Sequence, residues 1–235
     1  MKKLSCIILA LAVSVSSICF TSCKKEEKNS SSNHDNALVH DNPGKDDNAS
    51  EKELPYGATI VKMLPENFPE INIVTEYDRR FLSEDEAALV SNYFNAINNN
   101  DTELFESLYY EGYSEFYGKL ANAENTASFL QMIKAEMSEI IKNEFVFDYL
   151  LINDCVRHTD DAAATYLFSE LDAIIKKFAD EKGDTSLMNS INSRKVVLVE
   201  AYYENDEEYS SLSNVHGEDM AIYIYRINGK AYIVS

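Results

Sequence analysis

The chain has 235 residues, with 21 Lys and Arg against 40 Asp and Glu, and a formal net charge of −19. We expect neither a nucleic-acid partner nor a basic face that binds an anionic membrane, because a negatively charged protein is repelled by phosphate groups. Hydrophobic residues make up 45% of the chain, enough for a folded core, and the length leaves room for one domain of about 100–200 residues and a tail.

Residues 1–22 have the layout of an export signal. The positive start Met1–Lys3 precedes an apolar run of 17 residues, Leu4–Phe20, which four serines dilute. A membrane-spanning helix needs roughly 17–25 apolar residues, so a permanent transmembrane anchor is the less favoured alternative.

Cys23 stands at the end of this signal. Phe20–Cys23 resembles the lipobox of bacterial lipoproteins, because small residues precede the cysteine and the polar run Lys24–Lys28 follows it; Phe20 stands where that family prefers Leu. The resemblance implies cleavage after Ser22 and lipidation of Cys23. Acyl chains, at about 0.8 kcal/mol per buried methylene, would then hold the protein on the outer face of a bacterial cell membrane. The alternative is ordinary secretion with a free Cys23 thiol.

The folded part is left with too few cysteines to form an internal disulfide. Cys6 and Cys19 leave with the signal and Cys23 would carry lipid, so Cys155 alone remains in the folded part. Cys155 follows an apolar run and is expected to pack rather than react. His158, three residues on, would point to the opposite face of a strand.

Residues 23–55 are predicted to form a disordered tether, because small, polar and charged residues cannot offset the entropy of ordering. Residues 56–235 form the predicted domain. It holds 14 Lys and Arg against 32 Asp and Glu, a net charge of 14 − 32 = −18, and all 15 tyrosines.

Three helices open the domain. Ser83–Glu86 reads as a capping box, and apolar residues then recur on one helical face as far as Ile97, before Asn98–Asn100 ends the helix. Asp101 can cap a second, short helix. A third is expected over residues 126–142, with apolar residues at helical spacing and a polar opposite face.

Strands follow. A strand is expected over residues 145–152, with a possible extension to 158, and another over 195–204. Residues 162–168 are predicted to be the hairpin partner of the strand that starts at residue 145, followed by a helix that begins near Ser169; one helix throughout 162–182 is the alternative. Asn228 and Gly229 predict a final hairpin in which Tyr225 faces Tyr232.

This order predicts an α+β fold in which N-terminal helices pack on one face of a curved antiparallel sheet. Tyr93–Asp101 and Gly229–Val234 resemble segments of domains similar to nuclear transport factor 2, although Ala231 replaces the usual tryptophan. The resemblance spans residues 82–235, with residues 169–194 as a helical insertion. It implies a cone-shaped fold that hosts ketosteroid-isomerase-like enzymes, polyketide cyclases and noncatalytic binders, and it carries over no catalytic residue.

No motif for a metal, cofactor or phosphate is present. The chain lacks G-x-S-x-G, a P-loop, H-E-x-x-H and C-x-x-C. His158 and His216 are too few for a histidine-rich metal site, and Glu204–Glu208 lacks the ligand spacing of a calcium loop. We expect no cofactor and no metal.

Asp148 and a set of tyrosines are the candidate site residues. Asp148 interrupts an apolar strand, and burial would raise its pKa toward the range of a general base; alternatively it faces solvent or meets Arg157 or Lys195. Tyrosines are rigid and amphipathic, so several could line a ligand pocket or belong to the core and its rim. The pocket candidates are Tyr149, Tyr166, Tyr223, Tyr225 and Tyr232.

Three functions remain open. The first is a noncatalytic, lipid-tethered domain that binds a small molecule, a glycan or a partner protein through the mouth of its cone. The second is an isomerase- or cyclase-type enzyme with Asp148 as base in a closed apolar pocket. The third is a structural partner of a membrane complex, with an exposed apolar or tyrosine patch.

Overall fold

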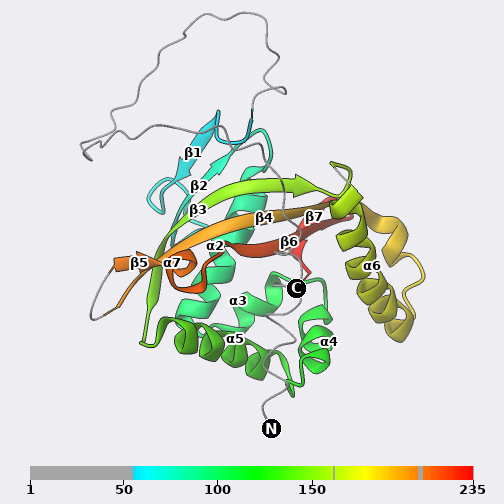
Figure 1. Ribbon diagram of the computed structural model, residues 1–235. Coiled ribbons are helices and arrows are strands. Elements are labelled where there is room, and N and C mark those ends of the chain that lie inside the picture. The colour runs from blue at the N-terminus through cyan, green and yellow to red at the C-terminus, as the bar shows by residue number, and fades with distance from the viewer. Residues whose placement is uncertain (1–54, 161, 206–208, 235) are drawn as a thin grey trace, which may run out of the picture.

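The computed structural model describes residues 55–160, 162–205 and 209–234 (Figure 1). The predicted export signal, Cys23 and almost all of the predicted tether lie outside the described residues. The described part has an α+β fold, as the sequence predicts.

One sheet of seven strands organises the fold. The main strands run in the order β1-β2-β3-β4-β6-β7, and β5 pairs with β4. Their bounds are β1 Ile60–Met63, β2 Val74–Asp78, β3 Val146–Arg157, β4 Ile191–Glu204, β5 Tyr209–Ser211, β6 Met220–Ile227 and β7 Lys230–Ile233.

The sheet is mixed, so the prediction of a purely antiparallel sheet was wrong. β2 and β3 are parallel, whereas the other pairs are antiparallel. The sequence did not reveal β1 and β2, which form a hairpin around the prolines at 65 and 69. The long connection through four helices then brings the chain back to start β3 in the direction of β2, as parallel pairs require.

Six α-helices and one short 3-10 helix accompany the sheet in the described residues. They are α2 Glu84–Asn99, α3 Thr102–Ser107, α4 Tyr113–Leu120, α5 Thr126–Ile141, α6 Ala162–Lys182, η2 Leu187–Ser190 and α7 Leu212–His216. The three helices predicted at the start of the domain are confirmed as α2, α3 and α5. α4 was not predicted.

Local capping explains the boundaries of α2 and α3. The Ser83 backbone N–H donates to the Glu86 carboxylate at 3.1 Å, as in a capping box. Asn100 ends α2 in the left-handed conformation, with φ of 52°. The Asp101 carboxylate then accepts from the Leu104 N–H at 3.0 Å and starts α3.

α6 corrects the prediction of a strand over residues 162–168, because one helix runs through Ala162–Lys182. Leu167, Leu171 and Ile175 recur every four residues and form a buried stripe with Phe168, Phe178 and Ala179. A strand would point half of these side chains to solvent, whereas the helix buries them all on one side. The helical alternative is therefore correct.

The C-terminal hairpin follows its predicted register. Tyr225 lies opposite Tyr232, and Ile224 opposite Ile233. Asn228 and Gly229 both have positive φ, 51° and 82°, as a tight turn between paired strands requires.

Helices cover both faces of β6. Arg226 forms an ion pair with Glu86 of α2 at 3.2 Å, whereas the Tyr225 ring lies 6.0 Å from that of Phe168 in α6. Successive strand residues point to opposite faces, so α2 and α6 pack on opposite sides of this strand. Figure 1 shows α6 beside α4, near the end of β7.

Glu86 joins α2 to the sheet. Its side chain is 1% exposed and lies 2.5 Å from Lys195 Nζ of β4. Burial alone would raise the pKa of Glu86, but hydrogen bonds from Lys195 and the Ser83 N–H, with the nearby Arg226 charge, lower it. This ion pair therefore stabilises the ionised carboxylate in the folded state.

We predict that Lys195→Met lowers the free energy of unfolding by about 3 kcal/mol, because it leaves the buried Glu86 carboxylate with one cation fewer. Urea unfolding at neutral pH measures the loss. Glu86 contributes this stability above its unfolded pKa and loses it as pH falls through its lower folded pKa, so the difference between wild type and variant should shrink in acid. Lys119→Met, in an exposed pair with Glu115, is the control and should change stability by less than about 0.5 kcal/mol. Equal losses in both variants would contradict this account.

Candidate functional site

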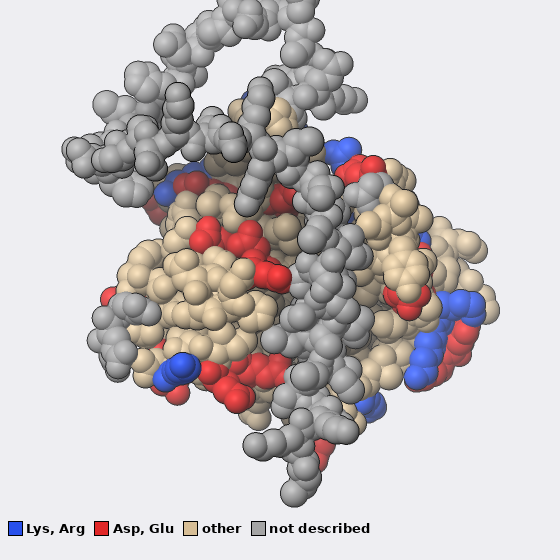
Figure 2. Space-filling view, viewed as in Figure 1, with Lys and Arg blue, Asp and Glu red and all other residues tan. Residues whose placement is uncertain are grey.

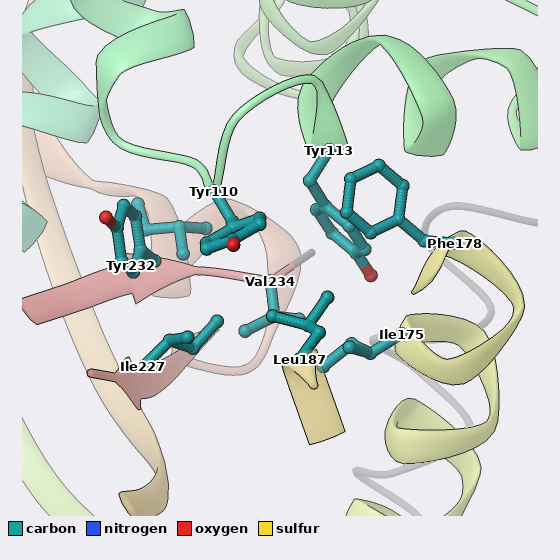
Figure 3. Close-up of a pocket in the computed structure, with 9 residues that line it drawn as sticks. Tyr110, Tyr113, Ile175, Phe178, Leu187, Ile227, Tyr232 and Val234 are labelled. Carbon is teal, nitrogen blue, oxygen red and sulfur yellow. The ribbon is translucent and has the colours of Figure 1, made fainter. Parts of the chain in front are cut away.

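α6 packs against β6, where the Phe168 ring contacts the rings of Tyr223 and Tyr225. With α4 and η2 it encloses a hollow that has room for about one water molecule (Figure 3). The rings of Tyr113 and Phe178 meet edge to face there, 5.3 Å apart. The hollow is lined by Tyr110, Tyr113, Ile175, Phe178, Leu187, Ile227, Tyr232, Ile233 and Val234.

Several tyrosine hydroxyls lie in the core without a hydrogen-bond partner in the described part of the chain. They belong to Tyr109, Tyr113, Tyr203 and Tyr223. Burial raises the pKa of Tyr109 and Tyr113, and raises that of Tyr223 to about 12. The phenols of Tyr109, Tyr113 and Tyr223 therefore stay neutral near pH 7 and cannot act as bases.

The five tyrosines that the sequence suggested as pocket residues lie in different parts of the structure. Tyr232 lines the hollow, and Tyr223 and Tyr225 are buried beneath Phe168 of α6. Tyr149 lies on another part of the sheet, and Tyr166 is 64% exposed on α6. The structure therefore brings three of them to the covered region beneath α6 and leaves two outside it.

Tyr113→Phe should leave the free energy of unfolding unchanged or raise it by about 1 kcal/mol, because it removes a buried hydroxyl that makes no hydrogen bond. Tyr225→Phe is the matched comparison. The Tyr225 hydroxyl donates to Asp172 at 2.9 Å, so its loss should cost about 1 kcal/mol. Urea unfolding of both variants measures the difference. A clear loss of stability in Tyr113→Phe would mean that its hydroxyl is satisfied by a bound molecule such as water.

A second group of tyrosines lies together on the sheet away from α6. Tyr149 of β3 is directly opposite Tyr202 of β4, and their rings are 5.4 Å apart, edge to face. Tyr209 of β5 stacks on Tyr202 at 6.0 Å and is 55% exposed. Strand pairing thus brings Tyr149 beside Tyr202 and Tyr209, which lie more than 50 residues further along the chain.

A carboxylate lies beside the hydroxyl of each ring: Glu76 beside Tyr149, Glu200 beside Tyr202, and Asp148 beside Tyr209. Burial and then the paired carboxylate raise the pKa of all three tyrosines, that of Tyr202 to about 12. We call the surface formed by these six residues, with Glu204 and Asp219, the tyrosine–carboxylate face.

Asp148 belongs to this face and is exposed. Partial burial raises the pKa of Asp148, the Tyr209 hydroxyl lowers it, and the Glu204 charge raises it again, with a net increase. Asp148 therefore lies beside Tyr209 rather than beside Arg157 or Lys195. An exposed carboxylate lacks the closed apolar pocket that the general-base hypothesis requires.

The pKa of Asp148, followed by carbon-detected NMR of its carboxyl group, should lie above the ordinary value of 3.8. Tyr209→Phe should raise it further, because the hydrogen bond to the ionised form is lost. Glu204→Gln should lower it, because a neighbouring negative charge is removed. Shifts in the opposite directions would rule out the arrangement of these three side chains.

The charge of the face is unbalanced. Lys62 Nζ lies 3.1 Å from Glu76 and 5.1 Å from the centre of the Tyr149 ring. Within the described residues, no Lys or Arg forms an ion pair with Asp148, Glu200, Glu204 or Asp219. Figure 2 shows more acidic than basic side chains on the half of the viewed face that carries α7.

Within the described residues, Cys155, His158 and His216 belong to no cluster of metal ligands. Cys155 is buried, and burial raises the pKa of its thiol to about 12, so the reactive thiolate is suppressed. No cluster of three or more His, Cys, Asp or Glu in residues 55–160, 162–205 and 209–234 could hold a metal ion. Every helix in the same ranges is too short or too polar to cross a membrane.

Tyr202 was among the tyrosines that the sequence suggested for a pocket, whereas sequence reasoning missed Tyr209, Glu76 and Glu200 as site residues. One signal was available, because Glu200, Tyr202 and Glu204 alternate along the strand and so share one face. Glu76 and Tyr209, however, lie on β2 and β5, which the sequence did not reveal, and no local pattern connects them with β4.

No family model, no curated protein and no solved structure matches this chain.

Proposed function

We propose that this chain is a lipoprotein anchored by Cys23 to the outer face of a bacterial cell membrane, and that residues 56–235 bind a partner protein without catalysis. The order of charged, apolar and small residues before Cys23 supports the anchor. The strongly acidic domain would be repelled by anionic headgroups, which favours binding to something other than the membrane surface.

The observation that carries the choice of a protein partner is the position of α6. Its buried stripe occupies the opening of the sheet and leaves a hollow the size of about one water molecule, far below what a metabolite or sugar needs. The tyrosine–carboxylate face is the exposed alternative, and tyrosine is enriched where proteins bind one another. The domain can equally serve as a structural member of a membrane complex.

We further propose that the fold is a variant of the nuclear transport factor 2-like cone. The two segments that carry the resemblance are the end of α2 and the β7 hairpin strand, and α6 occupies most of the predicted insertion. The isomerase- or cyclase-type alternative has less support, because Asp148 is exposed.

Cys23→Ala should move the protein from the membrane fraction to the soluble fraction, because it removes the only acylated side chain of the proposal. Mass spectrometry of the mature wild-type N-terminus should find the added mass of the acyl chains on Cys23. A bare Cys23 thiol, or a cytosolic protein, would contradict the anchor.

Partner binding is tested by photo-crosslinking in intact cells. A photoreactive residue placed at Val146 or Tyr209, which are 56% and 55% exposed, should give a discrete crosslinked product. The same residue at Tyr166 of α6, 64% exposed, reports binding elsewhere on the domain. The absence of a product at all three positions would count against a protein partner.

A further inference from the structure

We propose that the tyrosine–carboxylate face docks an extended segment of a partner protein that carries Lys or Arg side chains at alternate positions. The inference rests on the proposed function and names the chemistry of the partner. It concerns the surface formed by Tyr149, Tyr202 and Tyr209 with the carboxylates of Glu76, Asp148, Glu200, Glu204 and Asp219.

The rings and carboxylates are suited to cations in two ways. An aromatic face attracts an ammonium or guanidinium group, and a nearby carboxylate adds Coulomb attraction and a hydrogen-bond acceptor. The rings pack on one another, Tyr149 against Tyr202 and Tyr202 against Tyr209, so their orientations are restricted before a partner arrives. Fixed rings lose little conformational entropy when they bind.

Lys62 already occupies one such position. Its ammonium group lies over the Tyr149 ring and contacts Glu76, at 5.1 and 3.1 Å. The chain's own lysine thus demonstrates that one tyrosine–carboxylate pair holds an ammonium ion. The pairs Tyr202–Glu200 and Tyr209–Asp148 have the same composition, and no Lys or Arg of the described residues forms an ion pair with their carboxylates.

The negative charge of the domain indicates which kind of partner can bind the tyrosine–carboxylate face. The domain has a net charge of 14 − 32 = −18, so a second copy of the chain and an anionic lipid surface would both be repelled. A basic polypeptide complements it.

The spacing of the rings favours a polypeptide. Neighbouring ring centres lie 5.4 and 6.0 Å apart. Side chains two residues apart on an extended strand lie about 6.6–6.8 Å from one another on the same side. A segment with Lys or Arg at every second position can therefore reach successive tyrosine–carboxylate pairs.

The test titrates the full-length protein, purified in detergent, with a fluorescent hexalysine peptide at low salt and follows fluorescence anisotropy. We expect saturable binding. Tyr209→Leu should weaken it about threefold through loss of one ring face, and the double variant Asp148→Asn/Glu204→Gln about tenfold. Tyr166→Leu and Glu181→Gln, exposed positions on α6, are the matched controls and should bind like wild type.

Three results would overturn the inference. The first is no binding of hexalysine, and the second is equal weakening by the α6 controls, which would mean diffuse attraction to an acidic protein. The third is tighter binding after Lys24, Lys25 and Lys28 are changed to Ala, which would mean that the chain's own N-terminal lysines occupy the face. The two proposals can be told apart. If a partner crosslinks at Tyr166 but not at Tyr209, and Tyr209→Leu does not change hexalysine binding, the proposed function stands and the tyrosine–carboxylate face is rejected as the binding site.

Discussion

The packing of α6 on β6 and α4 determines which surfaces of the described domain stay exposed. Its apolar stripe buries Tyr223 and Tyr225 of β6 and, with α4, fills the opening that a curved sheet would otherwise leave. The burial of one large apolar side chain contributes roughly 1.5–3 kcal/mol, and five of the seven buried residues of α6 are large. Of these, Phe168 packs on β6 and Phe178 packs on α4. A ligand pocket in this position would require that packing to be undone.

Two buried carboxylates, Glu86 in the first turn of α2 and Asp78 at the end of β2, hold neighbouring elements together. Glu86 connects α2 with β4 and β6 through Lys195 and Arg226. Asp78, which is fully buried, accepts hydrogen bonds from Thr59 and Arg80, and its pKa is held well below the usual range chiefly by Arg80. These contacts place β1 and β2 beside β3, and so bring Lys62 and Glu76 to the tyrosines of the outer face.

Local signals made much of the fold predictable. The capping box at Ser83, the Asp101 cap and the Asn228-Gly229 turn each depend on a few neighbouring residues, and all three were identified from the sequence. The strand expected over residues 162–168 failed because its short alternation also fits a helix, and only the surface available on β6 decides between them. The parallel pairing of β2 with β3 depends on contacts more than 70 residues apart, which no local pattern contains. The candidate site was recognised only in part: Asp148 and Tyr149 were candidates from the sequence, but their position beside Tyr202 and Tyr209 depends on the pairing of β3, β4 and β5.

The central claim is that binding takes place on the tyrosine–carboxylate face and not in the hollow beneath α6. Amide chemical-shift mapping by NMR, on the full-length protein in detergent with hexalysine added, tests it most directly. The account predicts shifts confined to β3, β4 and β5 around Tyr149, Tyr202 and Tyr209. Shifts centred instead on Tyr113, Phe178 and Tyr232 would contradict it, because they would place the ligand beneath α6.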